Sequence, residues 1–349
     1  MSNEYYALIL EFNARVVKLG FAREAIEHVQ LTPSHPTWQK YAFQQQSQVE
    51  PSFLGLSSHC LDNDLKIQLL GNSRSDSALE RMLEQYQKDY DLVQWFDWST
   101  NGFVELSRLV RHLISTSLLV SPLFTKLFVV DNGLLALSKR MFCETMTKML
   151  TCAAVVFLSY SLCTSIASGV SDALVIDFGW ETCKIYTVID YRVVRSEEFV
   201  EFSHESIHYR IMKDRGTNSF SEIEIFIQDV VCDSEDVFAE LGLEQLPEVI
   251  ANLIQKSAID NRPLLSQNII ITGFFAQYSR FQIACFQETT KALQTLSANG
   301  LENLGAWCGA SIYCSTILFT ENYDDWKHMQ IGSGKLTVES ARELERYHG

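Results

Sequence analysis

The sequence predicts an α/β fold of two lobes, and three observations lead to this prediction. The chain has 349 residues, which exceeds the usual length of one domain. Apolar strand patterns alternate with amphipathic helix patterns, as in an α/β layer. A strand–turn–strand unit near residue 5 returns about 165 residues later at "ALVIDFGWETCKIYTVID" (173–190), and such a repeat indicates two similar lobes that face each other. We predict the first lobe over 1–170, the second over 171–335 and a tail over 336–349.

The first lobe opens with two strands joined by a tight turn, over residues 5–19. Apolar residues flank a polar break from Glu11 to Arg15, the pattern of a hairpin. Residues 34–75 are rich in Gln, Ser and Asn, so we expect a mobile, partly looped insertion there. Helical spacing predicts helices over 77–92 and at "NGFVELSRLVRHLISTSL". A buried strand at "KLFVVDNG" and helices through "SKRMFCETMTKML" and "FLSYSLCTSIASG" follow.

The second lobe continues this alternation after the hairpin at 173–190. Its patterns predict a helix at "LPEVIANLIQKS", a buried strand with a glycine turn at "QNIIITGFF", a helix at "RFQIACFQETTKAL" and a glycine-bounded helix at "GAWCGASIYCS". The polar stretch at the end of the chain is expected to form a surface helix or a tail.

The composition narrows the function classes. A formal net charge of -15 opposes nonspecific attraction to nucleic acid or to an anionic membrane. Nine scattered cysteines form no CxxC pair and are interpreted as buried, reduced thiols. The N-terminus is too acidic for a signal peptide, and no apolar stretch reaches about 18 residues without polar breaks. We therefore expect a cytoplasmic or nuclear protein with protein partners.

Glycine turns at the ends of buried strands mark the candidate site. Gly20, Gly179 and Gly273 stand at such turns, and two strands close on an acid, Glu11 and Asp177. An apolar strand that ends at an aspartate beside a glycine is typical of folds that hold the phosphates of ATP, where backbone amides face the anion.

Taken in chain order, these stretches resemble the actin and actin-related family. "LILEFNARVVKLGFA" resembles the family's first phosphate-binding hairpin, and "LVIDFGWETCK" is similar to its second phosphate loop. "SLCTSIASG", "VIANLIQKSAIDNRPLLSQNIIITG" and "AWCGASI" resemble the helix before that loop, the adenosine-side helix and strand, and the Trp-x-Gly-Gly-Ser segment. The resemblance covers most of the chain and is weak over 25–125. It implies an actin-like fold of two lobes, a duplication of a ribonuclease H-like unit, with a nucleotide cleft.

The sequence departs from the family pattern in both phosphate loops. Where the family has a turn rich in glycine and serine, this chain has Phe12 to Arg15, and Trp180 and Glu181 replace the metal-side aspartate and its glycine. Tyr160 falls on the family's water-positioning glutamine, so we expect no catalytic residue. What remains is a remnant nucleotide cleft, and whether it retains ATP or ADP is left open. Its candidate residues are Lys18, Asp177, Gly179 and Gly273.

We expect no metal site in this chain. His204 and His208 are four residues apart, but "SHESIHYRIMK" brings no third ligand nearby. A solvated start of a helix is therefore the expected setting for both histidines. No serine or cysteine has a recognisable partner for nucleophilic catalysis.

The second lobe is short for the family. Gly273 follows Asp177 by 96 residues, fewer than the family pattern has, and the reduction falls on the outer subdomain near "VVCDSEDVFAELGLEQLP". Small size and altered phosphate loops are most similar to the fungal form of the pointed-end actin-related subunit of dynactin. The resemblance implies a non-catalytic cytoskeletal subunit that caps the pointed end of dynactin's actin-like filament and contacts the filament subunit and its pointed-end neighbours. It would serve dynein-driven transport and nuclear or spindle positioning.

Two alternatives stay open at this point. One is an actin-related subunit of a nuclear chromatin-remodelling complex. The other is an ATPase of the actin and sugar-kinase superfamily, which would need intact glycine-rich phosphate loops and a catalytic acid.

Overall fold

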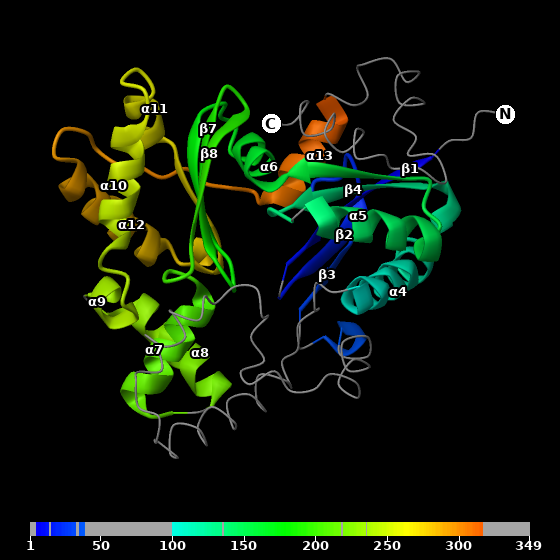
Figure 1. The fold of residues 1–349 in the computed structure, drawn as a ribbon, viewed down its shortest axis with the longest axis horizontal. Coiled ribbons are helices and arrows are strands. Elements are labelled where there is room, and N and C mark those ends of the chain that lie inside the picture. Colours follow the sequence, from blue (N-terminus) through cyan, green and yellow to red (C-terminus); the bar gives the residue numbers. More distant parts are fainter. Residues whose placement is uncertain are drawn as a thin grey trace.

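The computed structural model describes residues 5–13, 15–32, 35–38, 100–134, 136–217, 219–234 and 236–316. They form a mixed α/β structure with two mixed sheets, one in each half of the molecule (Figure 1). The α/β class that the sequence predicts is confirmed. The predictions for 77–92, for the tail at 336–349 and for all but 35–38 of the expected insertion lie outside the described residues. Trp38, at the start of that insertion, is buried in the core of the first half.

The first sheet has five strands in the order β3-β2-β1-β4-β5. β1 pairs antiparallel with β2, and β2 with β3, whereas β1, β4 and β5 run parallel. The β1–β2 hairpin and β4 confirm the sequence predictions, and β3 and β5 were not predicted. The strands are β1 (Tyr6–Phe12), β2 (Val17–Phe21), β3 (Val29–Leu31), β4 (Thr125–Asp131) and β5 (Ala154–Ser159).

The second sheet has four strands in the order β8-β7-β6-β9. β6 pairs antiparallel with β7, β7 pairs antiparallel with β8, and β6 runs parallel to β9. Beyond β9, Gly300 makes an isolated parallel bridge to Ile269. The predicted strands β6, β7 and β9 are confirmed, and β8 was not predicted. The strands are β6 (Ala173–Phe178), β7 (Cys183–Ile189), β8 (Arg192–Phe199) and β9 (Ile269–Gly273).

The two sheets share one plan. In each, an antiparallel three-stranded unit is extended by a strand parallel to its first strand. The first strand carries an acid opposite a lysine of the second: Glu11 faces Lys18, and Asp177 faces Lys184. The strand–turn–strand repeat predicted from the sequence therefore extends to strand order and register.

Helices cover both faces of the first sheet. Because side chains alternate along a strand, Leu8 and Leu10 of β1 pack on one side and Ile9 on the other. The first side holds α4 (Thr100–Thr116), α5 (Ala136–Thr145) and the π-helical turn η3 (Met146–Leu150). The second side holds α6 (Tyr160–Ala167) and α13 (Ala306–Thr316). Thus α13 packs on the first half, although the predicted boundary assigns it to the second lobe. A short 3-10 turn, η2 (Pro122–Phe124), precedes β4.

The helices of the second half form two groups (Figure 1). One group covers a face of the sheet, and the other, α7 to α9, gathers at one end of this half. The first group is α10 (Leu246–Lys256), α11 (Arg262–Gln267), the 3-10 turn η4 (Phe274–Gln277) and α12 (Ser279–Leu293). The second group is α7 (His204–Arg215), α8 (Phe220–Asp233) and α9 (Val237–Leu241).

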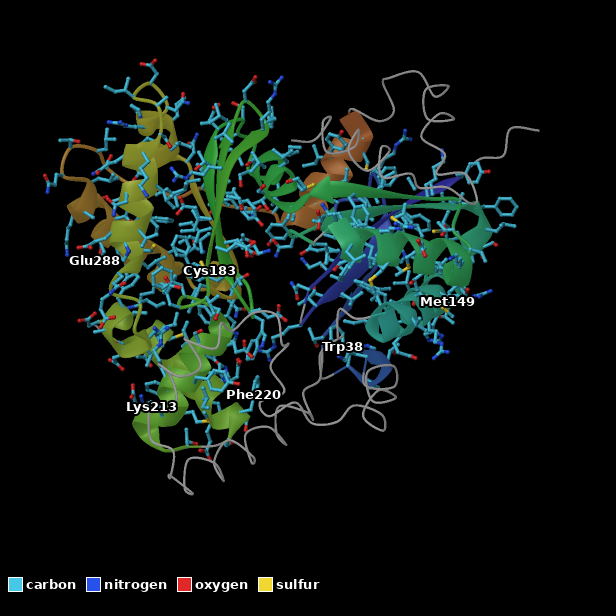
Figure 2. The ribbon with its side chains drawn as sticks, viewed as in Figure 1. Trp38, Met149, Cys183, Lys213, Phe220 and Glu288 are labelled. Carbon is cyan, nitrogen blue, oxygen red and sulfur yellow. The ribbon has the colours of Figure 1, made fainter. Side chains whose placement is uncertain are left out.

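Side chains fill the spaces between sheets and helices, and Figure 2 labels two of these buried side chains, Cys183 of β7 and Phe220 of α8. Of the eight cysteines in the described ranges, all unpaired, six are buried, Cys308 is half-buried and Cys232 is exposed. The expectation of buried thiols is therefore wrong for Cys232, which lies in the last turn of α8. No helix in the described part is long and apolar enough to cross a membrane.

Candidate functional site

The turns of the two hairpins border a small pocket between the halves. The first half lines it with Phe12, Asn132 and Leu134, and the second half with residues 179–182 and Lys184. Its volume is about 110 Å³, whereas pockets for small ligands and cofactors usually measure about 300–1,000 Å³. The pocket is therefore smaller than a nucleotide site.

Asp177 lies at the end of β6 beside this pocket and is buried. Its Oδ2 accepts a hydrogen bond of 2.7 Å from Nδ2 of Asn132, which follows β4 in the first half. Lys184 donates to the Asn132 carbonyl at 2.8 Å, and the Tyr186 hydroxyl donates to Asn132 Oδ1 at 3.1 Å. Burial raises the pKa of Asp177, while the Asn132 hydrogen bond and Lys184 act in the opposite direction. The Asp177 carboxylate therefore interacts with a hydrogen-bond donor and a positive charge from the protein itself.

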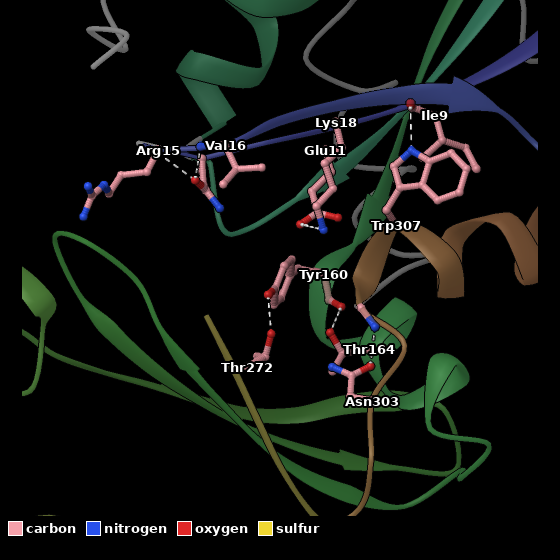
Figure 3. Close-up of polar contacts among 12 residues, drawn as sticks. Ile9, Glu11, Arg15, Val16, Lys18, Tyr160, Thr164, Thr272, Asn303 and Trp307 are labelled. Carbon is pink, nitrogen blue, oxygen red and sulfur yellow. Dashed lines mark hydrogen bonds and ion pairs between the residues drawn. The ribbon is translucent and has the colours of Figure 1, made fainter. Parts of the chain in front are cut away.

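Lys18 lies in β2, across the first hairpin from Glu11, whereas the other three candidate residues belong to the second half. Its Nζ is 3.6 Å from Glu11 Oε1 (Figure 3). Glu11 is buried, and burial raises its pKa against the lowering effect of Lys18. Lys18, a predicted residue of the remnant nucleotide cleft, thus forms an ion pair with Glu11 on the neighbouring strand.

Gly179 and Gly273 lie so close to neighbouring backbone atoms that a side chain would not fit at either position. A Cβ at Gly179 would lie 2.7 Å from the Thr182 carbonyl oxygen, and the Gly179 amide donates to that oxygen at 3.1 Å. Gly273 has φ +77°, and a Cβ there would lie 2.3 Å from the Phe178 carbonyl oxygen. Since β6 and β9 run parallel, Asp177, Gly179 and Gly273 meet at one edge of the second sheet.

Asn13 binds the backbone amides of the first turn. Its Oδ1 accepts from the amides of Arg15 and Val16, at 2.8 Å each (Figure 3). In a phosphate-binding turn such amides point at the anion, but here a side chain already uses them. Phe12 stacks on Phe142 in the core of the first half, with 5.4 Å between ring centroids. The sequence indicated larger side chains in this turn, but it did not show that the Asn13 side chain binds the amides of the turn.

The second turn is held against α7. Carbonyl oxygens of Gly179 and Trp180 accept from the amides of His204 and Glu205, at 3.2 and 3.0 Å. Trp180 is buried, with its ring centroid 4.8 Å from that of His204 and 5.2 Å from that of His208. The expectation of a solvated helix start is therefore wrong, because the first turn of α7 is covered by the hairpin.

Glu224 of α8 is the group that sequence spacing missed. Its Oε1 lies 2.9 Å from His208 Nε2, 3.2 Å from His204 Nε2 and 2.8 Å from Arg15 Nη1. Burial lowers the pKa of both histidines. Burial acts to raise the pKa of Glu224, but the His208 hydrogen bond and the charge of Arg15 bring it to about 2. Two imidazoles and one carboxylate thus meet at one point, a ligand set that can hold a metal ion.

Tyr160 joins the two halves. It begins α6, is buried, and its hydroxyl lies 2.7 Å from Thr272 Oγ1 of β9 (Figure 3). Burial raises the pKa of this phenol well above its usual value. Tyr160 is thus packed at the start of a helix.

No protein-family model matches the chain, and a search of curated proteins finds no match either. Its function is therefore inferred from the fold and the site.

Proposed function

We propose that this chain is a non-catalytic actin-related subunit with a closed, degenerate nucleotide cleft. The two sheets of one plan support the duplicated, two-lobed fold of that family. The order of family-like stretches along the chain supports it as well, with "LVIDFGWETCK" on the β6–β7 hairpin and "AWCGASI" on α13.

One observation carries the non-catalytic part of the proposal: Asn13 uses the two turn amides that an anion would need. The pocket volume of about 110 Å³ and the Asn132 hydrogen bond to Asp177 point the same way. Side chains of the protein thus already bind the groups that would contact the phosphates, so we expect neither ATP nor ADP to be needed for the fold.

Within the family, we propose a cap on the pointed end of dynactin's actin-like filament, with the filament subunit and the pointed-end subunits as partners. Head-to-tail subunits continue a filament until one carries a face that accepts no further neighbour. Such a terminator stays in place, so nucleotide-timed release is not needed. The proposed setting is the cytoplasmic cytoskeleton, in dynein-driven transport and in nuclear or spindle positioning.

Affinity purification of the full chain from its own cells tests the assembly. We expect the subunits of dynactin's filament and pointed end to co-purify with it. Recovery of a chromatin-remodelling complex in their place would contradict the proposal.

Nucleotide extraction from the purified chain tests the cleft. We expect ATP plus ADP well below one equivalent and no phosphate release. Stoichiometric nucleotide, with a phosphate release that Asp177→Asn abolishes, would instead identify an ATPase.

A further inference from the structure

The cluster of His204, His208 and Glu224 lies beside the hairpin turns, and the proposed function makes no use of it. The two histidines stand four residues apart on α7, so their imidazoles lie on one face of the helix. Glu224 comes from the first half of α8. One ligand atom from each residue lies within 4.8 Å of the other two. Histidines at this helical spacing, with an acid nearby, form zinc sites in other folds.

A second observation is that the ring nitrogen Nε2 of His204 is buried without a hydrogen-bond partner. The residue is 2 % exposed, and this nitrogen makes no hydrogen bond although Glu224 Oε1 is 3.2 Å away. A buried polar atom without a partner calls for an explanation, and a bound ion supplies one. The imidazole ring stacks on Phe274, with 3.7 Å between centroids, and Trp180 contacts it edge-on. These two aromatic side chains shield the imidazole from solvent.

Arg15 supplies the positive charge next to Glu224. Its Nη1 lies 2.8 Å from Glu224 Oε1, and its guanidinium carbon lies 5.6 Å from the Trp180 ring centroid and 5.3 Å from that of Phe220. Arg15 belongs to the β1–β2 turn of the first half, whereas the cluster belongs to the second. A metal ion and this guanidinium would compete for the same carboxylate oxygen.

We propose that His204, His208 and Glu224 bind a divalent transition metal ion of the Zn²⁺ type, which replaces Arg15 on Glu224. Two imidazoles and one carboxylate form a three-ligand zinc set with an open fourth position. Mg²⁺ and Ca²⁺ are disfavoured because they prefer oxygen ligands. Metal binding removes the ion pair between Arg15 and Glu224, so the ion controls one link between the halves. This inference is independent of the role in a filament.

Calorimetric titration of the chelator-treated full chain with Zn²⁺ tests the site. We expect one equivalent to bind, with a dissociation constant lowered about 10-fold or more in Arg15→Ala because the competing cation is gone. Glu224→Gln keeps the shape of the side chain and removes its charge, and we expect affinity to fall about 100-fold. Circular dichroism shows whether this variant is folded. Titration with Co²⁺ adds a visible spectrum that reports imidazole and carboxylate coordination.

His28→Ala is the matched control, because His28 pairs with Glu24 at 3.1 Å on the surface and lies outside the cluster. Its Zn²⁺ affinity should equal that of the unmodified chain. Equal binding by Glu224→Gln, or a loss in His28→Ala, would overturn the site. Binding by Arg15→Ala alone would also overturn it, since the native chain would then use Arg15 as its permanent cation.

Discussion

Asp177 is a buried carboxylate whose ionised form is held by groups of the protein. It is 2 % exposed, and Asn132 donates a side-chain hydrogen bond to it. Burial still outweighs these contacts and raises its pKa above the ordinary 3.8. The folded chain therefore holds this proton to a higher pH than the unfolded chain does.

This shift predicts a pH-dependent difference between the chain and its Asp177→Asn variant. Above pH 3.8 the folded state binds more protons at Asp177 than the unfolded state, so the stability contributed by this group falls as pH rises through the raised pKa. The variant has no such group. Its free energy of unfolding, relative to the unmodified chain, should therefore rise with pH.

Urea unfolding at a series of pH values from about 4 to 7 measures this difference. Asp233→Asn, on the exposed end of α8, makes the same change of charge at the surface and is the control. A difference between the Asp177 variant and the unmodified chain that stays constant with pH would show that burial does not raise this pKa.

Among single residues, the sequence indicates most clearly those whose pattern lies within a few consecutive positions. Asp177 and Gly179 were found because a strand end and a tight turn are visible in a few consecutive residues. The roles of Asn132 and Glu224 depend on segments far apart along the chain: Asn132 is 45 residues from Asp177, and Glu224 is 209 residues from Arg15. The His204–His208 spacing was a usable signal, but its third member lies on the next helix.

Among elements, period and turn residues explain both the correct and the missed predictions. The β6–β7 hairpin and α10, α12 and α13 were predicted because each pattern ends at a clear break. β5 was missed because "AAVVFLSYSLC" runs without a turn residue from strand into helix. β8 was missed because "RVVRSEEF" is half charged, and its pairing with β7 is a tertiary effect that single-strand propensity does not capture.

The contact of α6 with α13 depends on Gly309. A Cβ at this position would lie 1.7 Å from the Cys163 carbonyl oxygen and 3.1 Å from the Ala167 amide nitrogen. Backbone atoms cannot move aside as a flexible side chain can. The two helices therefore approach closely only because α13 carries a glycine on this face.

We expect Gly309→Ala to lower the free energy of unfolding by about 1–3 kcal/mol, the usual cost of overpacking a core. The gain in helix propensity, about 1 kcal/mol, offsets only part of it. Urea unfolding measures the change. Ser315→Ala, in the last turn of the same helix, is the control and should change stability by no more than about 0.5 kcal/mol. An unchanged or increased stability of Gly309→Ala would mean that the helices are further apart.

At the scale of the whole molecule, a few polar contacts join the two halves. Tyr160 meets Thr272, Arg15 meets Glu224, and Asn132 contacts Asp177, Lys184 and Tyr186. Most of these contacts lie at the hairpin ends, where the proposed function places a remnant nucleotide cleft. Side chains of the protein itself therefore join the hairpin ends. Asn132 makes three of these contacts, whereas the Tyr160–Thr272 and Arg15–Glu224 pairs make one each.

Asn132→Ala is the sharpest test of this closure. It removes the donor to Asp177 and the acceptor of Tyr186 but keeps the backbone carbonyl that binds Lys184. Leaving a buried carboxylate without its donor should cost about 1–3 kcal/mol. Because both lost bonds cross between the halves, the hairpin turns should open more often than the two cores. We therefore expect faster amide hydrogen exchange at residues 15–16 and 179–182, with α10 and α12 unchanged.

Hydrogen exchange read by mass spectrometry measures the opening, and urea unfolding gives the stability. Asn303→Ala is the control, because Asn303 accepts from the nearby Gly305 amide, at 2.9 Å, within its own loop. It should leave exchange at both hairpin turns as it was. Equal exchange at residues 179–182 in Asn132→Ala and in the unmodified chain would mean that the remaining contacts hold the halves together without Asn132. Faster exchange across α10 and α12 as well would mean that the second half and the cleft open as one cooperative unit.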